Sequence, residues 1–338
     1  VVDVEDIYDD FSGGLLDPMA IRSFVTYAEA NWDPAPVFIL LMGDGTYDYK
    51  NNLGISHANW IPPFQDGSSM YDEWYVRTDG NDRLPDLAIG RLPVSSASNA
   101  NSLVDKLIAY DRDPEMGLWQ ARALLVADDR SNPSTNNDES FFVYDAEFLA
   151  EFLMPEDLDL KKLYIGQYPL EGRTKPAARD DFIQQFNEGA LILTYIGHGN
   201  PATLAHEQMF VLTRDIDGIN NEGRLPFVYT AASQVGVFDD PLRESMPEVF
   251  LNDPNGGVIG FISATRVGFH ASNMVLAREF HRIMYRGEEA AVPIGLALTL
   301  AKQRIVITAG DRVNVQRYSL MGDPAQILHR PRLNVQLE

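Results

Sequence analysis

Short apolar runs alternate with helix-like patterns along nearly the whole chain. The apolar runs cover residues 37–42, 123–127, 190–195, 226–230 and 257–262, and residues 160–164 read as a further short strand. Between them, apolar residues recur at the three- to four-residue spacing of a helix face, and we predict helices over 17–31, 96–110, 139–152, 176–188, 273–285 and 294–309. Strands that alternate with helices are typical of βαβ units. The pattern therefore predicts an α/β fold with a mostly parallel sheet flanked by helices.

The two ends of the chain have the pattern of strands. Residues 1–8 read VVDVEDIY and residues 334–337 read NVQL, so we expect a segment cut from a longer protein. The polar stretch 111–116, which Pro114 interrupts, marks a seam between two halves. We place an N-terminal α/β subdomain at 1–115, a larger subdomain that carries the site at 116–332, and the start of a following domain or linker at 333–338.

Composition excludes several classes of protein. Hydrophobic residues make up 45% of the 338 residues, which is enough for a packed core and excludes a disordered chain. The chain has 27 Lys and Arg against 49 Asp and Glu, and this net charge of −22 disfavours nucleic acid and anionic lipid as partners. No apolar run reaches the roughly 18 residues of a membrane span. Cysteine is absent, which excludes disulfides, thiolate metal sites and a cysteine nucleophile.

The first candidate for chemistry is a histidine between two glycines. Residues 195–200 read YIGHGN and continue an apolar run. In open parallel sheets, ligands bind at the carboxyl ends of strands, and glycine allows a sharp turn and a close approach. We therefore take His198 as a candidate catalytic base, against the alternative of a loop histidine that only caps a turn.

The second candidate is Ser233, which lies in residues 230–236 (TAASQVG) after the next apolar run. It follows His198 by 35 residues, about the length of one βα crossover, so adjacent parallel strands would bring the two side chains together. A nucleophile beside a histidine base is the general arrangement for acyl transfer. The alternative is a small residue that packs at a strand end.

A third candidate is an acid that would orient His198. Asp128 and Asp129 directly follow the run 123–127, at a third predicted strand end. A carboxylate there would fix the tautomer of the imidazole, as the third member of a catalytic triad does. The alternative is a solvated acidic loop.

Metal binding is a weaker hypothesis. Residues 43–49 (GDGTYDY) and 79–82 (DGND) are acidic glycine turns of the kind that bind calcium, but the twelve-residue calcium-loop spacing is missing. We expect structural turns there, and a metal-dependent hydrolase site is the alternative. The other histidines lack metal-ligand spacing and are expected to be surface or packing residues: His57, His206, His270, His281 and His329.

Taken in order, these motifs resemble the gingipain family of cysteine peptidases over nearly the whole chain. The resemblance rests on residues 40–45 (LLMGDG), 79–82 (DGND), 87–92 (LAIGRL), 195–199 (YIGHG), 225–228 (LPFV) and 322–325 (GDPA). Further segments resemble the sortase-type members of the type IX secretion system: 4–11 (VEDIYDDF), 45–50 (GTYDYK), 238–241 (FDDP), 252–257 (NDPNGG) and 265–266 (TR). The resemblance implies a caspase-like α/β fold with two subdomains and no cofactor, with a structural calcium ion left open.

The resemblance also implies catalytic roles. His198 matches the family's catalytic base, and Ser233 stands where the family has its nucleophilic cysteine. Asp129 falls at or next to the acid that contacts the histidine, and backbone N–H groups near Gly199 and Ser233 would hold the oxyanion. Serine is a much weaker nucleophile than cysteine, so we expect little activity from this sequence. Two origins stay open: a serine introduced in place of a natural cysteine, or a degenerate family member.

The sortase-type resemblance implies a protein substrate and a location. Such enzymes remove C-terminal sorting domains from secreted cargo at the outer surface of the outer membrane, which implies a barrel partner there. The acid that selects basic residues in the arginine-cutting gingipains falls near Phe141, which argues against cleavage after basic residues. The rival hypothesis is a pseudoenzyme, a binding module that recognises sorting domains without cleaving them.

Overall fold

One large sheet runs through the molecule. A computed structural model describes residues 1–55, 59–67, 69–79, 83–129, 139–286, 291–309 and 312–330. The eight strands lie in the order β1-β4-β13-β12-β11-β7-β5-β6. Their bounds are β1 Phe38–Met42, β4 Ala88–Leu92, β13 Tyr318–Gly322, β12 Gly260–Ala264, β11 Phe227–Ala231, β7 Ile192–Ile196, β5 Arg122–Ala127 and β6 Asp159–Tyr164. Neighbouring strands are parallel except β12 and β13, so the predicted mostly parallel sheet is confirmed.

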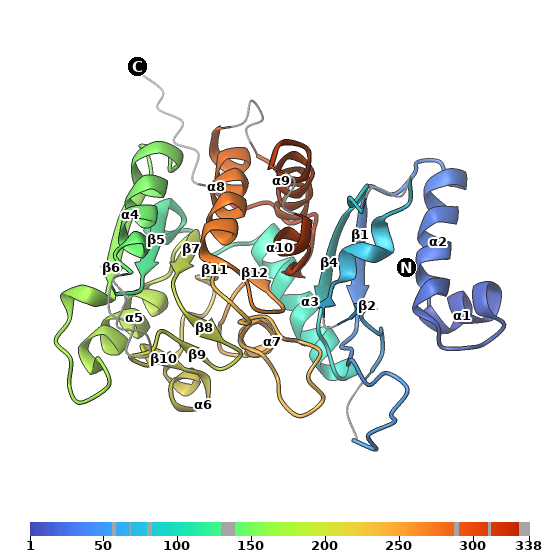
Figure 1. Cartoon of the computed structure of the whole chain (residues 1–338), viewed down its shortest axis with the longest axis horizontal. Helices are drawn as coiled ribbons and strands as arrows, with labels where there is room; N and C mark the ends of the chain where they lie inside the picture. Colours follow the sequence, from blue (N-terminus) through green and yellow to red (C-terminus); the bar gives the residue numbers. More distant parts are fainter. Residues whose placement is uncertain are drawn as a thin grey trace.

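Helices flank this sheet, and Figure 1 shows α1 and α2 beside β1 at one end and α4 near β6 at the other. The main helices are α1 Val4–Ser12, α2 Pro18–Asn31, α3 Ala97–Arg112, α4 Phe141–Phe148, α5 Pro176–Glu188, α7 Met246–Asn252, α8 His270–Arg286 and α9 Ile294–Ala309. Helix α4 continues into a π-helical turn, Leu149–Leu153, which packs with α8, and α8 packs with α9. Helix α3 packs with α7, and α7 meets α5 through the rings of Phe250 and Phe186.

Shorter elements complete the described chain. A three-stranded sheet is formed by β8 Gly199–Asn200, β9 Thr203–Leu204 and β10 Phe210–Val211, and it follows β7 directly. A two-stranded sheet is formed by β2 Gln65–Asp66 and β3 Ser69–Met70. Two short helices are α6 Leu212–Asp215 and α10 Arg312–Gln316.

The predicted strand at the N-terminus is wrong, because this segment forms α1. Asp3 caps the helix by accepting the Glu5 N–H at 3.0 Å. Ile7 and Tyr8 are buried, and Val4 and Phe11 pack beside them, which is the spacing of one helix face. The alternation of valine with acidic residues at 1–5 resembles the two-residue period of a strand, and it obscured the helical period of the whole segment.

Two other strand predictions need correction. The run 37–42 forms β1, but β1 is an edge strand with Leu40 and Met42 about 40% exposed (39% and 41%) rather than a buried one. Strands β4 and β13 were not predicted as strands, although they complete the sheet. Through β13, a segment from the end of the chain lies beside β4 from its first third, so the sheet crosses the predicted boundary at 115/116. That boundary stays a prediction, and residues 331–338 lie outside the described part.

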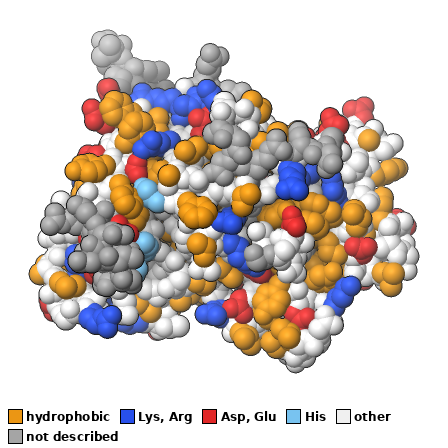
Figure 2. All heavy atoms as spheres, viewed as in Figure 1, with side chains coloured by type: hydrophobic (Ala, Val, Ile, Leu, Met, Phe, Trp, Pro, Cys, Tyr) orange, Lys and Arg blue, Asp and Glu red, His pale blue; other side chains and the backbone are white. Residues whose placement is uncertain are grey.

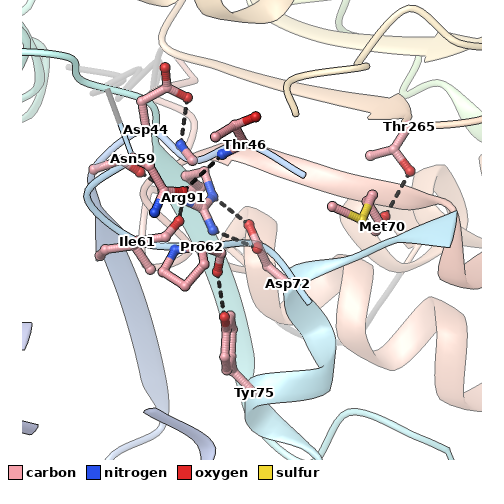
Figure 3. A network of polar contacts seen from close by, with 12 residues as sticks. Asp44, Thr46, Asn59, Ile61, Pro62, Met70, Asp72, Tyr75, Arg91 and Thr265 are labelled. Atoms are coloured by element: carbon pink, nitrogen blue, oxygen red, sulfur yellow. Dashed lines mark hydrogen bonds and ion pairs between the residues drawn. The ribbon is translucent and has the colours of Figure 1, made fainter. Parts of the chain in front are cut away.

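A buried arginine ties the first third of the chain to the sheet. Arg91 in β4 is fully buried, and its Nε and Nη2 donate to the two carboxylate oxygens of Asp72 at 2.7 Å each. Its Nη1 donates to the carbonyl oxygens of Gly43 and Ile61 at 2.7 and 2.8 Å. Figure 3 shows these contacts converging on Arg91, with the Tyr75 hydroxyl donating to Pro62 below them. The network holds the loops at 43–46 and 59–62 against the sheet.

The acidic glycine turn at 43–49 belongs to this structural network. The carboxylate of Asp44 accepts the Gly45 N–H at 2.8 Å, and Asp48 accepts the N–H groups of Asn52 and Leu53 at 2.8 Å each. A Cβ at Gly45 would lie 2.1 Å from the Ile61 carbonyl oxygen, so glycine permits the close approach of the two loops. These contacts agree with the expected structural turn. In the second turn, residues 80–82 lie outside the described part.

Candidate active site

The two strongest sequence candidates lie at neighbouring strand ends. Strands β7 and β11 are parallel neighbours, and Ile196 pairs with Ala231 in their last registered pair. His198 and Ser233 each follow that pair by two residues, so they leave the sheet at the same level. A Cβ at Gly199 would lie 3.5 Å from the Ser233 carbonyl oxygen and 2.6 Å from Val235 Cγ2. The two loops are therefore in direct contact, and only glycine fits at 199.

The imidazole of His198 has a carboxylate partner that the sequence analysis missed. Its Nε2 lies 2.7 Å from Glu139 Oε2, and the histidine side chain is 36% exposed. A carboxylate oxygen accepts hydrogen bonds, so we assign the proton to Nε2, which leaves the lone pair of the neutral ring on Nδ1. Nδ1 is then the nitrogen that accepts a proton from a nucleophile.

The backbone at His198 is held by a second acid. The buried Asp128 accepts the His198 N–H at 2.9 Å and the Asp129 N–H at 2.8 Å. Burial raises the pKa of Asp128 to about 7, against the opposing effect of those two N–H bonds. The Tyr195 hydroxyl donates to the His198 carbonyl oxygen at 2.6 Å. A Cβ at Gly197 would lie 2.5 Å from Asp128 Cβ, which explains the first glycine of the motif.

The structure gives Asp129 a partner other than the one predicted. Its Oδ2 accepts from Lys175 Nζ at 2.6 Å, in a pair whose side chains are each 7% exposed. The same ammonium donates to the Ile165 carbonyl oxygen at 2.9 Å. The predicted orienting contact to the imidazole is made by Glu139 instead. Lys175 lies just before α5, 46 residues away in the chain, so only the tertiary fold reveals this pairing.

The sequence motif that contains Glu139 was noted, but it was interpreted as part of the specificity region. It lies in residues 138–141 (DESF), the segment compared above with the specificity acid. Residues 130–138, which separate Asp129 from Glu139, lie outside the described part of the structure. The polar composition of that loop, with Asp138 directly beside Glu139, offered no means of choosing Glu139.

Ser233 has a hydroxyl that is already engaged. Its Oγ donates to the Gly268 carbonyl oxygen and accepts the Gly268 N–H, both at 3.1 Å. The next residue, Gln234, has a φ of +59°, in the left-handed region that non-glycine residues rarely adopt. Such strained turns are concentrated at functional sites. Ser233 is partly exposed, so the position remains accessible to a substrate.

Aromatic and charged groups border the pair. The Phe142 ring lies edge-on to His198 with centroids 5.3 Å apart, and also edge-on to His270 at 5.0 Å. His270 Nε2 lies 2.7 Å from Asp145 Oδ2, and Arg278 binds the other oxygen of that carboxylate. Burial opposes ionisation of Asp145, but His270 and Arg278 outweigh burial and lower its pKa. Figure 2 shows histidine side chains at the surface of this face, with hydrophobic side chains beside them.

The remaining histidines lie in different surroundings. His206 lies against the imidazole of His198, with ring centroids 4.2 Å apart. His281 is fully buried and hydrogen bonds to Thr194 and Ala277, as expected of a core residue. His329 lies 3.6 Å from Asp111. His57 lies outside the described residues.

One grouping of acids has the spacing of metal ligands among the residues that the structure describes. Carboxylate oxygens of Asp128, Asp129 and Glu207 all lie within 4.8 Å of one another, and all three residues are buried. Burial and the nearby Asp129 raise the pKa of Glu207. Lys175 contributes a positive charge at this grouping through its 2.6 Å contact with Asp129. The raised pKa values of Asp128 and Glu207 and the Lys175 ammonium therefore offset part of the negative charge.

A mostly parallel sheet with a histidine between glycines at one strand end, and a small side chain at the next, defines a caspase-like peptidase fold. A sequence model described as "Peptidase family C25" matches residues 1–329. The chain therefore belongs to this family of cysteine peptidases, the gingipain family. The predicted family and fold are confirmed.

Comparisons with individual proteins agree with this assignment. Gingipain R2 of Porphyromonas gingivalis is 25% identical over 227 residues, which span 65% of this chain and 27% of that protein. The crystal structure of the Arg-specific cysteine proteinase gingipain R superimposes with a TM-score of 0.76 at 21% identity, covering 96% of this chain and 75% of the other. Dimeric latent PorU from the same organism gives a TM-score of 0.45 at 19% identity, covering 98% of this chain and 28% of that one. The TM-score for PorU lies below 0.5, so this comparison carries no argument about function.

No helix in the described ranges is both long and apolar enough to cross a bilayer.

Proposed function

We propose that this chain is a gingipain-type endopeptidase or sortase domain whose nucleophile position is residue 233. The proposal rests mainly on one observation: His198 and position 233 lie at the same level beyond the paired strands β7 and β11, with Glu139 bonded to the imidazole. That arrangement suits acyl transfer through a covalent intermediate.

The proposed mechanism uses the chain's own groups. The side chain at 233 would attack the scissile carbonyl carbon, while Nδ1 of His198 takes its proton and then returns it to the leaving amine. Glu139 would hold the ring and balance the imidazolium charge, a role that we assign to it in place of Asp129. Backbone N–H groups at Gly199 and Ser233 would bind the oxyanion. Water, an amine or a sugar would then release the acyl group.

The serine at 233 makes a slow enzyme or an inactive one. A thiol is a few per cent thiolate at neutral pH, whereas a hydroxyl needs a strong base to become nucleophilic. In this chain the hydroxyl is also bonded to Gly268 as both donor and acceptor. An attack would have to break those contacts first. This observation favours the second candidate function, a pseudoenzyme that binds its substrate without cleaving it.

The substrate and location rest on the resemblance of several sequence segments to sortase-type members. We propose that the substrate is the C-terminal sorting domain of a secreted protein, that the parent protein acts at the outer surface of the outer membrane, and that a membrane barrel is its partner. The segments 45–50 (GTYDYK) and 252–257 (NDPNGG) support this proposal. Phe141 falls near the position of the acid that selects basic residues in the arginine-cutting gingipains, which supports a substrate without a basic residue at the cleavage site.

The test is a Ser233→Cys variant, compared with Ser233→Cys/His198→Ala. The chain has no other cysteine, so a thiol-directed alkylating reagent reports on position 233 alone. We expect fast alkylation and cleavage of a peptide that spans a sorting-domain junction, with both lost when His198 is removed. An introduced thiol that is inert in a folded protein would reject the peptidase and favour the binding module. Fast alkylation without cleavage of that peptide would keep the peptidase and reject the substrate.

A further inference from the structure

The imidazole of His198 is held by aromatic groups as well as by Glu139. The Phe142 ring meets it edge-on, with centroids 5.3 Å apart and planes at 81°. The His206 ring lies closer, with centroids 4.2 Å apart and planes at 39°. Together with the 2.7 Å contact of Nε2 to Glu139, these rings restrict the rotation of the imidazole. The contact with His206 has no place in the mechanism proposed above.

The turn that carries His206 is built to hold it. The Ala205 N–H donates to the His198 carbonyl oxygen at 2.9 Å, which ties the turn to the histidine loop. The Gln208 N–H donates to the Ala205 carbonyl oxygen at 3.2 Å, and Arg214 donates to the Gln208 carbonyl oxygen at 2.9 Å. Ala205 and Gln208 have φ values of +63° and +55°. Backbone strain of this kind is concentrated at functional sites, so the two strained residues that flank His206 indicate a turn whose conformation serves the position of that ring.

Glu207 anchors the same turn on its other side. It is 6% exposed, and its carboxylate lies within 4.8 Å of those of Asp128 and Asp129. Asp128 in turn accepts the His198 N–H at 2.9 Å. The turn therefore contacts the site at two places: the imidazole face through His206, and the buried acids after β5 through Glu207.

Several charged and titratable groups face the two rings. Glu139 precedes α4, Asp128 and Asp129 follow β5, Glu207 lies in the turn itself, Lys175 precedes α5, and His270 begins α8. Burial, and then the neighbouring His198, lower the pKa of His206. This direction favours the neutral form of the His206 ring.

We propose that His206 is a positioning residue for His198: its ring covers one face of the imidazole and stabilises the imidazolium formed during acyl transfer. This inference rests on the proposed function. A cation against the face of an aromatic ring is favoured electrostatically. The ring also fixes the direction of Nδ1, because Glu139 alone leaves the imidazole free to tilt about the Nε2 contact.

The first experiment tests the ring contact without any catalysis. Histidine titrations followed by NMR in the unmodified chain are compared with His198→Ala and with the matched control His329→Ala. Because coupling between two sites is reciprocal, His198→Ala should raise the pKa of His206. His329 contacts Tyr110 and Asp111, away from these rings, and its replacement should leave the pKa of His206 unchanged. An unchanged pKa of His206 in His198→Ala would overturn the inference.

The second experiment tests the positioning role in the Ser233→Cys background. His206→Ala should slow alkylation of the introduced thiol at pH 7.5 about threefold, the effect expected of one solvent-exposed ring–cation contact. The pH profile of alkylation should move to higher pH, since the thiolate loses part of its imidazolium partner. His206→Phe keeps an aromatic ring and should restore the rate and the profile.

The outcomes separate this inference from the proposed function. Equal rates and profiles for the parent and His206→Ala would overturn the positioning role. An alkylation rate for His206→Phe that is as low as that of His206→Ala would also overturn it. A thiol that is inert in the Ser233→Cys parent would reject the proposed function and the positioning role with it. The NMR coupling would then still decide whether the two imidazoles are in contact.

Discussion

Glu139 and His198 are joined by a 2.7 Å contact between Oε2 and Nε2, although 59 residues separate them in the chain. The contact sets the tautomer of the imidazole and so decides which nitrogen faces the chemistry. Glu139 is almost buried, with its side chain 11% exposed, while the histidine remains accessible. A nearly buried carboxylate that orients a solvent-accessible imidazole is suited to general-base catalysis.

Removal of Glu139 should therefore slow the chemistry at position 233. In the Ser233→Cys background, we expect Glu139→Ala to lower the alkylation rate about 100-fold, within the range that general-base catalysis contributes. Glu151→Ala is the matched control, because Glu151 is an exposed glutamate in the turn after α4. Rates are measured over pH 5–9 together with the thermal midpoint. An unchanged rate in a folded Glu139→Ala protein would remove Glu139 from the mechanism.

Asp128 should make stability fall as pH rises. Burial raises its folded pKa to about 7 from an ordinary value of 3.8, so between these values the folded protein keeps a proton that the unfolded chain has released. The free energy of unfolding that depends on Asp128 is therefore greatest below about pH 4 and declines toward pH 7. Asp128→Asn removes this dependence. The measurement is the difference between the urea unfolding curves of the two proteins at pH 4, 5.5 and 7, and a constant difference would contradict the prediction.

His281 should act in the opposite direction. Its Nδ1–H donates to the Ala277 carbonyl oxygen at 2.7 Å, so Nε2 accepts from the Thr194 hydroxyl at 2.9 Å and the buried ring is neutral. Burial lowers its pKa to about 4. The unfolded chain then binds a proton that the folded protein excludes, and stability declines as pH falls from about 6.5 to 4, by about 3 kcal/mol at most.

The comparison for His281 is with His281→Gln, which does not titrate in this range. The free energy of unfolding is measured in urea at pH 7.5, 5.5 and 4 for both proteins. We expect the gap between wild type and variant to shrink toward acid pH. A gap that is the same at all three values would show that His281 does not remain neutral in the folded protein.

Removing one partner of the Arg91–Asp72 pair should destabilise the protein more than replacing both partners with apolar residues. Arg91 is fully buried, so Asp72→Ala leaves an unpaired charge and should cost about 3–5 kcal/mol of stability. Replacing both partners, as in Asp72→Ala/Arg91→Met, should cost less than the two single changes together. A double-mutant cycle in urea measures this coupling. Additive single costs would mean that the carbonyl oxygens of Gly43 and Ile61 suffice for the guanidinium.

Much of the fold was predictable because local signals agreed with it. Asp17 and Pro18 cap α2 as expected, and the Asp17 side chain accepts the Met19 N–H at 2.9 Å. Gly189 ends α5 with a φ of +83°. The apolar runs after residue 120 all became strands, since short apolar segments between helices are buried on both faces of a parallel sheet. The predicted strand at 160–164 also formed, as the partly exposed edge strand β6. Segments with a mixed pattern, such as residues 1–8, were misassigned because two periods fit a short window.

The amino-acid sequence by itself determined the family, the mostly parallel sheet and the two strand-end positions, His198 and Ser233. Each of these depends on residues that are neighbours in the chain, where spacing and glycine carry the information. The tertiary structure alone decided which acid meets the imidazole. Glu139 contacts Nε2 of His198, Asp129 pairs with Lys175, and the His206 ring lies against the His198 imidazole. Glu139 and Lys175 lie 59 and 46 residues from their partners, and the His206 contact depends on how the turn after β9 folds back. Hydrophobic periodicity in a single sequence does not record such contacts.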